Sequence, residues 1–387
     1  MRETNHIVHL SSSVTMECLP DSSVQLVVTS PPYPMIAMWD KPFSQHNPEI
    51  GRAMEEEHSD LAFQLMHQML DEVWMECFRV LKPGGIMCVN IGDAVRKLGG
   101  HFRMYSNHTR VLAGLQQIGF QVLPSILWRK PTNAPNKFMG SGMLPGGAYV
   151  TLEHEHILVL RKGGNRIFET EEAKVNRRES AFFWEERNTW FSDIWDVAGA
   201  RQSWTSTGDP NTSKEIRGRS AAYPLEIPVR LISMYSVYGD TVIDPFWGTG
   251  TTTQAAAALG RNSMGWEIDR GVAEFGVAQT LATIPQLPVI QEKRLESHRQ
   301  FIMNRAGGGK IFKYINSWSG LPVITGQERE LVLYGVTQGE LTDAGPNHRE
   351  ITLSHSPIEI PKEYSLNVLR NHGKADPLLV KTGSDKP

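Results

Sequence analysis

The sequence predicts an α/β fold in which a mostly parallel sheet carries helices on both faces. A short β-branched run at 25–29 precedes a segment from 59 to 80 whose apolar residues recur at helical spacing. The run KPGG at 82–85 is expected to end that helix, and a second strand is expected at 86–91. Strand, helix and strand in this order predict a right-handed parallel crossover. The same pattern returns at 241–266.

The remaining elements follow from the same periodicity. Two further strands are expected at 125–128 and 156–160, separated by a loop rich in Gly and Pro. From 161 to 220 the regular pattern stops, and arginines mix with aromatic residues, which indicates an inserted module. The pattern resumes with a strand at 241–243, an Ala-rich helix at about 252–259 and a strand at 263–266.

Composition limits the possible classes of protein. The chain has 387 residues and a formal net charge of −3, which excludes a protein that coats nucleic acid by charge alone. Its three cysteines form no CxxC pair, so we expect a reducing compartment and neither a metal cage nor a disulfide framework. Neither a signal peptide nor an apolar run long enough to cross a bilayer is evident. We therefore expect a cytoplasmic protein without a membrane anchor.

The first chemical motif is DPFWGTGTT at 244–252, placed between a predicted strand and a predicted helix. Glycines at such a turn let a ligand approach the backbone, and the helix N-terminus attracts an anionic group. Glu267 ends the next strand, 17 residues after Gly250, where a carboxylate can accept hydrogen bonds from both hydroxyls of a ribose. A GxG pattern alone is as often a simple tight turn. Together with the flanking strand, helix and acid, it predicts a nucleoside site.

The second motif is Thr29-Ser30-Pro31-Pro32-Tyr33, which follows the strand at 25–29. The lone pair of an aromatic amine is delocalised into its ring, so a catalyst must hold the amine hydrogens with well-placed acceptors. Ser30 Oγ and the Pro31 carbonyl can supply two acceptors, and Pro32 stiffens the turn that aims them. Tyr33 offers a flat face on which a base can stack. The alternative interpretation is a proline turn that merely closes the strand.

Together, the two motifs resemble those of the amino-methylating DNA methyltransferases of the β arrangement. The run 29–33 matches the catalytic motif IV of that family, and 244–250 matches its S-adenosylmethionine motif I, with motif IV first in the chain. The run AYPLEIP at 222–228 is similar to its motif X, which helps to seat the methionine end of the cofactor. The resemblance spans roughly residues 5–285.

The resemblance implies a doubly wound, Rossmann-like sheet in which the strands ending at Asp244 and Ser30 lie side by side. It places the following residues at S-adenosylmethionine: Asp244, Phe246, Gly248, Gly250, Thr251, Thr252, Glu267, Tyr223 and Pro224. Ser30, Pro31, Pro32 and Tyr33 would form the catalytic loop that holds the base, and no metal is expected. The family usually carries an acid near 11–13 to contact the cofactor adenine, and this chain has only serines there.

Four regions are expected. Residues 1–160 would form the catalytic half of the core and 221–286 the cofactor-binding half. Between them, 161–220 would recognise the target, because arginines read guanine edges and phosphates, although its aromatic residues can also be ordinary core. Residues 287–387 would form a C-terminal extension of unknown role, with a flexible turn rather than a phosphate loop at GGGK, 307–310. His154-Glu155-His156 lacks the HExxH spacing, so no metal site is predicted there.

The resemblance implies methyl transfer to an exocyclic amine of duplex DNA, with the target nucleotide flipped out of the helix. Adenine-specific relatives more often carry Asp at the position of Ser30, so we expect cytosine N4 as the acceptor and keep adenine N6 as the alternative. An RNA or protein methyltransferase, or a nucleoside-binding regulator without catalysis, is a more distant alternative. The expected setting is a restriction-modification system with a separately acting endonuclease, for a nucleoid-associated monomer or homodimer.

Overall fold

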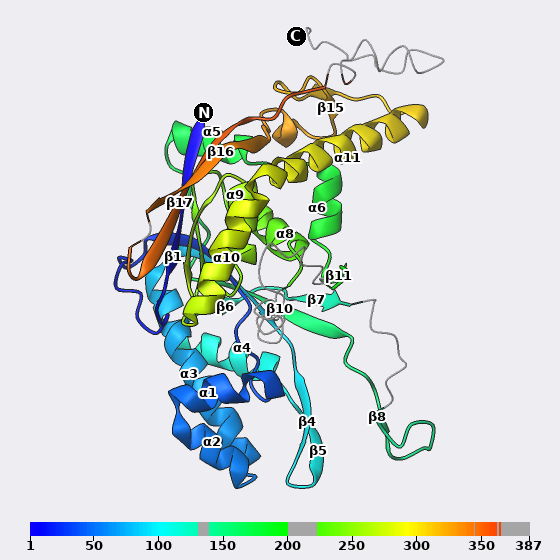
Figure 1. Cartoon of the computed structure of the whole chain (residues 1–387). Helices are drawn as coiled ribbons and strands as arrows, with labels where there is room; N and C mark the ends of the chain where they lie inside the picture. Colours follow the sequence, from blue (N-terminus) through cyan, green and yellow to red (C-terminus); the bar gives the residue numbers. More distant parts are fainter. Residues whose placement is uncertain (131–138, 200–222, 344, 362–363, 365–387) are drawn as a thin grey trace.

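A central sheet organises the computed structural model, which describes residues 1–130, 139–199, 223–343, 345–361 and 364 (Figure 1). In that described part the sheet has eleven strands. Their order is β11 (Ile194–Asp196), β7 (Ile126–Arg129), β10 (His154–Arg161), β3 (Leu81–Ile91), β2 (Val24–Thr29), β12 (Thr241–Asp244), β13 (Asn262–Trp266), β1 (Arg2–His9), β17 (His348–Pro357) and β16 (Tyr334–Asp343), with β6 (Gln121–Val122) beside β10.

The middle of the sheet is parallel. Neighbours pair in parallel from β3 through β2, β12 and β13 to β1, whereas β10 and β17 pair antiparallel on the two flanks. The chain runs outward from β2 to β3 on one side and from β12 to β13 on the other. Strand order therefore reverses between β2 and β12, and ligands of open α/β sheets bind at the carboxyl ends of strands at such a point. The doubly wound, Rossmann-like sheet is confirmed.

Both faces of the sheet are buried, and successive strand residues alternate between them. Val27 and Val89 pack with α3 (Ser59–Val80) and α4 (Asn107–Ile118) in one apolar cluster. Leu26, Val28 and Cys88 pack in a second cluster with α8 (Glu226–Tyr235) and α9 (Thr251–Ala258). A strand that is buried on both faces has little polar alternation, as the runs at 25–29 and 86–91 show.

The other α-helices of the described residues are α1 (Asp40–His46), α2 (Pro48–Glu55), α5 (Glu171–Glu179), α6 (Trp184–Trp190), α10 (Arg270–Thr283) and α11 (Pro288–Gly307). Short antiparallel pairs join β4 (Ala94–Leu98) to β5 (His101–Tyr105), β8 (Met139–Gly140) to β9 (Ala148–Tyr149) and β14 (Tyr314–Ile315) to β15 (Pro322–Val323). The β4–β5 hairpin extends away from the sheet at the bottom of Figure 1. Among the helices of the described ranges, none is long and apolar enough to cross a membrane.

The start of β3 differs from the expectation. The sequence predicts that KPGG separates the helix from a strand beginning at 86, but α3 passes directly into β3 at Leu81. Gly84 adopts a φ of +82° and its amide donates to the Lys162 carbonyl at 2.7 Å, while the Lys162 amide donates to the Gly85 carbonyl at 3.0 Å. The run is therefore held as irregular strand by cross-strand hydrogen bonds, which sequence spacing alone does not reveal.

The chain beyond 287 completes the sheet, which the sequence did not predict. β17 pairs antiparallel with the whole of β1, from Arg2 opposite His355 to His9 opposite His348. β16 pairs with β17 on its other side. Figure 1 shows β16 and β17 beside the N-terminal strand β1. The turn expected at GGGK is confirmed, because α11 ends at Gly307 and Gly309 has a φ of +81°.

The first part of the segment 161–220 packs against this extension. Phe183 is fully buried in an apolar cluster with Leu295 and Leu331, and Arg294 pairs with Glu186 at 2.6 Å. Trp190 and Trp195 are also buried. For these three aromatic residues the interpretation as ordinary core is confirmed. Arg201, Trp204, Arg217 and Arg219, which carry much of the target-recognition argument, lie outside the described residues.

Candidate active site

The two motifs meet where β2 and β12 end side by side. Thr29 Oγ1 donates a hydrogen bond of 2.7 Å to Asp244 Oδ1, which also accepts from the Phe246 amide at 3.1 Å. Asp244 Oδ2 accepts from Thr252 Oγ1 at 2.6 Å. Burial raises the pKa of Asp244 to about 6, although these hydrogen bonds favour the carboxylate. The expected juxtaposition of the two strands is confirmed, and Asp244 joins the motif IV strand, the motif I loop and α9.

The motif I loop needs its glycines for two reasons. Gly248 and Gly250 have φ values of +55° and +83°, a region that residues with a Cβ rarely adopt. In addition, a Cβ on Gly250 would lie 2.6 Å from the ring of Trp247. The loop then enters α9 at Thr251, so the amides of the first helical turn face the end of the sheet.

The Trp247 ring packs against three glycines, Gly250, Gly265 and Gly276, which together form a glycine cradle. A Cβ on Gly265 would lie 2.0 Å from Trp247 Cδ1, and a Cβ on Gly276 would lie 2.6 Å from Cζ3. The indole is buried, and its N–H donates to Thr253 Oγ1 at 2.7 Å. These glycines come from three different elements, so motif spacing could not identify the cradle. The packing of Trp247 against these glycines fixes the course of the motif I loop.

Glu267 follows β13 directly and lies beside this loop. Its Oε2 accepts from the Gly248 amide at 3.0 Å, and its Oε1 accepts from the Asp269 amide at 2.8 Å. Burial raises the pKa of Glu267 to about 7, while the two amides favour the charged form. Each carboxylate oxygen can accept more than one hydrogen bond, so both retain capacity for the hydroxyls of a ribose.

Tyr223 brings the motif X segment to the same place. Its hydroxyl hydrogen-bonds to Thr252 Oγ1, the group that also donates to Asp244. Burial, followed by the neighbouring Asp244, raises the pKa of Tyr223 well above its ordinary value, so the hydroxyl keeps its proton. Pro224 follows in a half-buried position. Ala222, the first residue of the expected motif, lies outside the described residues.

In motif IV, Ser30 and Tyr33 belong to a hydrogen-bond network, and the sequence predicted only these two of its members. Ser30 Oγ lies 3.0 Å from the Tyr33 hydroxyl, and that hydroxyl donates to Glu155 Oε2 at 2.8 Å. Asn90 Nδ2 donates to the Tyr33 oxygen at 2.8 Å and to Glu155 Oε2 at 2.6 Å. Lys130 forms an ion pair with Glu155 from the other side. Pro31 is buried and Pro32 half-buried within the loop.

Asn90 and Glu155 are site residues that sequence reasoning missed. A polar side chain at the carboxyl end of a buried strand was the available signal for Asn90, which is the penultimate residue of β3. Glu155 stands out in the sequence only as part of a possible metal motif. Gly92 leaves room for the network, because a Cβ there would lie 2.9 Å from Tyr33 Cε2 and 3.2 Å from Glu155 Cγ.

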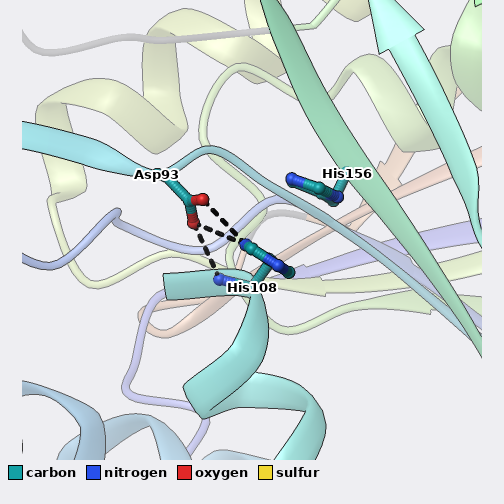
Figure 2. A group of neighbouring side chains, drawn as sticks. All are labelled: Asp93, His108 and His156. Atoms are coloured by element: carbon teal, nitrogen blue, oxygen red, sulfur yellow. Dashed lines mark hydrogen bonds and ion pairs between the residues drawn. The ribbon is translucent and has the colours of Figure 1, made fainter. Parts of the chain in front are cut away.

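Asp93, His108 and His156 form a neighbouring cluster (Figure 2). The Asp93 carboxylate accepts from His108 Nδ1 at 2.8 Å, and the rings of His108 and His156 stack with centroids 3.8 Å apart and planes 13° apart. Burial, followed by the neighbouring His108, lowers the pKa of His156 to about 4. These are zinc-type ligands, but the nitrogen lone pairs of the two stacked rings lie in separate, nearly parallel planes and do not converge on one ion. The prediction made from sequence, that no metal binds at His154-Glu155-His156, stays a prediction.

Comparison with known proteins decides the family. Residues 24–278 match the DNA methylase family of N6 and N4 methyltransferases. The chain belongs to this family. The match contains both motifs and most of the parallel sheet, and the resemblance seen in motifs IV and I is confirmed at the level of an amino-methylating DNA methyltransferase.

Several relatives of this DNA methylase are similar over most of their length. The chain is 47% identical over 334 residues to the type II methyltransferase M.MthZI of Methanothermobacter thermautotrophicus, covering 86% of this chain and 91% of that one. It is 49% identical over 280 residues to the type II methyltransferase M.MjaI of Methanocaldococcus jannaschii, covering 70% and 89%. A putative DNA modification methylase of Thermus thermophilus, solved with S-adenosyl-L-methionine, is 29% identical with a TM-score of 0.55, covering 72% and 95%.

The cofactor of this DNA methylase is S-adenosylmethionine, and the residues present fit it. A Cβ on Gly248 would meet no atom nearer than 3.9 Å, so the backbone there is open to a ligand, and the buried carboxylate of Glu267 retains acceptor capacity beside it. Residues 11–13 are serines, so the carboxylate that the family usually has there for the cofactor adenine is absent at these positions. The individual cofactor contacts predicted from the motifs stay predictions.

Proposed function

We propose that this enzyme methylates the N4 amino group of cytosine in duplex DNA. The supporting observation is the neutral hydroxyl of Ser30 at the end of β2, where adenine-specific relatives more often carry a carboxylate. Thr29, the neighbour of Ser30 in the chain, is bonded to Asp244, so the motif IV loop begins beside the motif I loop. Donor and acceptor would thus share one crevice at the switch point of the sheet.

Ser30 Oγ and the Pro31 carbonyl accept hydrogen bonds from the two amine hydrogens, which favours a pyramidal nitrogen with its lone pair exposed. Bound S-adenosylmethionine supplies an electrophilic methyl group to that lone pair. The protein contributes by alignment and by stabilising positive charge on nitrogen. Because Ser30 is a neutral hydroxyl, we propose that the amine loses its proton after methyl transfer and not before.

The amine is inaccessible within a duplex, so the target nucleotide would be flipped out at an unstacking cost of about a few kcal/mol, offset by contacts with DNA. Tyr33 would stack on the flipped base, and residues 161–220 would supply sequence recognition. A place in a restriction-modification system, with a separate endonuclease, is supported by the names of the type II methyltransferases to which the chain is similar. Monomer and homodimer are both compatible with this proposal.

The test is transfer of a labelled methyl group to duplex DNA, compared with RNA and protein, followed by digestion to nucleosides and mass measurement. We expect N4-methylcytosine in DNA alone. If N6-methyladenine is the sole product, the acceptor is adenine N6 and not cytosine N4, and the cofactor site assignment is unaffected. Label in RNA or protein but not in DNA would refute the DNA substrate, and no transfer to any of the three would indicate a regulator without catalysis.

A further inference from the structure

The network around Tyr33 determines which hydrogen bonds Ser30 can make, and the inference drawn from it rests on the proposed role of Ser30 as an amine acceptor. A serine hydroxyl has one hydrogen to donate and two lone pairs to accept with. If Ser30 received a hydrogen bond from Tyr33, part of its acceptor capacity would be lost. The direction of the Ser30–Tyr33 hydrogen bond therefore matters for holding the amine.

Each neighbouring hydrogen bond has a defined direction. Glu155 is ion-paired with Lys130, and an ionised carboxylate only accepts. The Tyr33 hydroxyl must then donate its single hydrogen to Glu155 Oε2, at 2.8 Å. Burial, followed by the charge of Glu155, raises the pKa of Tyr33 well above its ordinary value, so this hydrogen is retained.

Asn90 supports this orientation from a third side. Its side chain lies 2.6 Å from Glu155 Oε2 and 2.8 Å from the Tyr33 oxygen. Only the NH₂ end can face a carboxylate at that distance, because the carbonyl end would repel it. Both hydrogens of Asn90 Nδ2 are thus donated into the network, and the Tyr33 oxygen is left to act as acceptor toward Asn90 and Ser30.

We propose that Glu155 is a positioning residue that acts through Tyr33, turning the Ser30 hydroxyl hydrogen toward Tyr33 and leaving both Ser30 lone pairs free for the amine. Ser30 thereby becomes an acceptor-only group, as a carboxylate would be. Asn90 and Lys130 hold Glu155 in the orientation that this requires. The enzyme thus has a carboxylate near the amine, but this carboxylate acts on Ser30 through the Tyr33 hydroxyl and does not contact the amine itself.

The experiment uses the fact that the two carboxylate oxygens of Glu155 have different partners. Oε2 accepts from Tyr33 and Asn90, and Oε1 faces the Lys130 ammonium. In Glu155→Gln only one end can be oxygen, and the full charge of Lys130 will attract it. The NH₂ end then faces Tyr33, whose hydrogen turns toward Ser30. Removing the ammonium, in Glu155→Gln with Lys130→Met, lets the amide rotate so that its oxygen faces Tyr33 and Asn90 again.

We expect Glu155→Gln to lower the kcat for DNA methylation about 10- to 100-fold, the range for losing a hydrogen bond to a charged group. S-Adenosylmethionine affinity, measured by calorimetry, should stay within about twofold, since Glu155 lies on the acceptor side. The double variant Glu155→Gln/Lys130→Met should regain most of the lost kcat. Glu153→Gln, the same change two residues away, is the matched control and should keep the parental kcat.

Rescue of kcat without a parallel recovery of the melting temperature cannot be explained by a merely structural role, in which Lys130→Met only removes an unpaired ammonium. Nor can the charge of Glu155 explain it, because the double variant has neither carboxylate nor ammonium. Parental kcat in Glu155→Gln would overturn the proposal, and so would a double variant no faster than the single one. The unmodified enzyme is assayed first on duplex DNA, so failure of the proposed function appears there, before any variant is compared. If adenine N6 is the acceptor, the same test applies, because it too is an exocyclic amine.

Discussion

Thr29 Oγ1 donates to Asp244 Oδ1 at 2.7 Å, and this bond joins the ends of two strands that lie 215 positions apart in the chain. It is buried and links the strand of the catalytic motif to that of the cofactor motif. Loss of this donor removes one of the hydrogen bonds to the buried carboxylate, which costs about 1–3 kcal/mol. The same bond also holds the motif IV loop beside the motif I loop.

Thr29→Val, which keeps the shape of the side chain, should therefore lower the free energy of unfolding by about 1–3 kcal/mol. Urea denaturation measures this change. Thr337→Val is the control, since Thr337 is exposed on β16 and should lose far less. Equal stability of the two variants would show that the Thr29–Asp244 bond does not stabilise the fold.

Ser30→Ala should leave cofactor affinity within about twofold of the parent while reducing methyl transfer at least about tenfold, because the hydroxyl acts on the acceptor amine. Calorimetry with S-adenosylmethionine and a labelled-methyl assay on duplex DNA measure the two effects separately. Activity within about twofold of the parent would remove Ser30 from the acceptor site.

Glu267 makes stability depend on pH. Its pKa is raised from 4.5 to about 7, chiefly by burial, so the folded protein binds this proton more tightly than the unfolded chain does. The resulting contribution to stability is present below about pH 4.5 and is lost as pH rises through about 7. Glu267→Gln should therefore remove part of the fall in the free energy of unfolding across this window. An unchanged pH profile would contradict the raised pKa.

Cofactor binding should show the opposite pH dependence at this residue. The carboxylate form offers more acceptor capacity to the ribose hydroxyls than the protonated form, so affinity for S-adenosylmethionine should weaken as pH falls below about 7. Glu267→Ala should weaken affinity by about 1–3 kcal/mol. Unchanged affinity by calorimetry would break the assignment of this acid to the cofactor.

The parts of this enzyme that follow from local pattern could be predicted from sequence. The strand before Ser30, the helix at 59–80 and the strand before Asp244 each have a periodicity that is set by their own burial. The pairing of β17 with β1 could not be predicted, because it joins segments about 345 residues apart and neither has an unusual pattern of its own. Long-range pairing depends on the folded context.

The same distinction holds within the site. Ser30 and Tyr33 can be identified because their motif is continuous, whereas Asn90, Lys130 and Glu155 come from separate segments that meet only in the fold. Glu155 also lies between two histidines, and that context suggests a metal motif. His154 and His156 share one face of β10, since their positions differ by two and their ring centroids lie 5.0 Å apart.

Arginines of the segment 161–220 should differ in their effect on DNA. Arg178 is ion-paired with Glu330 at 2.8 Å, so Arg178→Ala should change DNA binding little. Arg201, Arg217 and Arg219 lie outside the described residues, and their replacement by Ala should either relax discrimination at one base pair or weaken binding to all sequences equally. Binding titrations on cognate and altered duplexes distinguish the two outcomes. If a scan of all the arginines of 161–220 changes neither quantity, recognition shifts to the tail after 287.

The glycine cradle of Trp247 gives the last prediction. Gly265→Ala would place a Cβ 2.0 Å from Trp247 Cδ1, and because the indole is buried and hydrogen-bonded to Thr253 it cannot move freely. Overpacking of this kind costs about 1–3 kcal/mol. It should also displace the motif I loop, so that affinity for S-adenosylmethionine falls with stability. Thermal unfolding with and without the cofactor measures both effects.

Two controls make this prediction specific. Gly164→Ala meets no atom within 4 Å and requires no unusual φ, so it should leave stability and cofactor affinity unchanged. In a Trp247→Ala background the Cγ and Cδ1 atoms that the new Cβ would meet at 2.5 and 2.0 Å are absent, so adding Gly265→Ala there should not weaken cofactor affinity further. If Gly265→Ala weakens binding equally with and without the indole, the clash with Trp247 is not the cause, and Gly265 is required for the strand β13 itself.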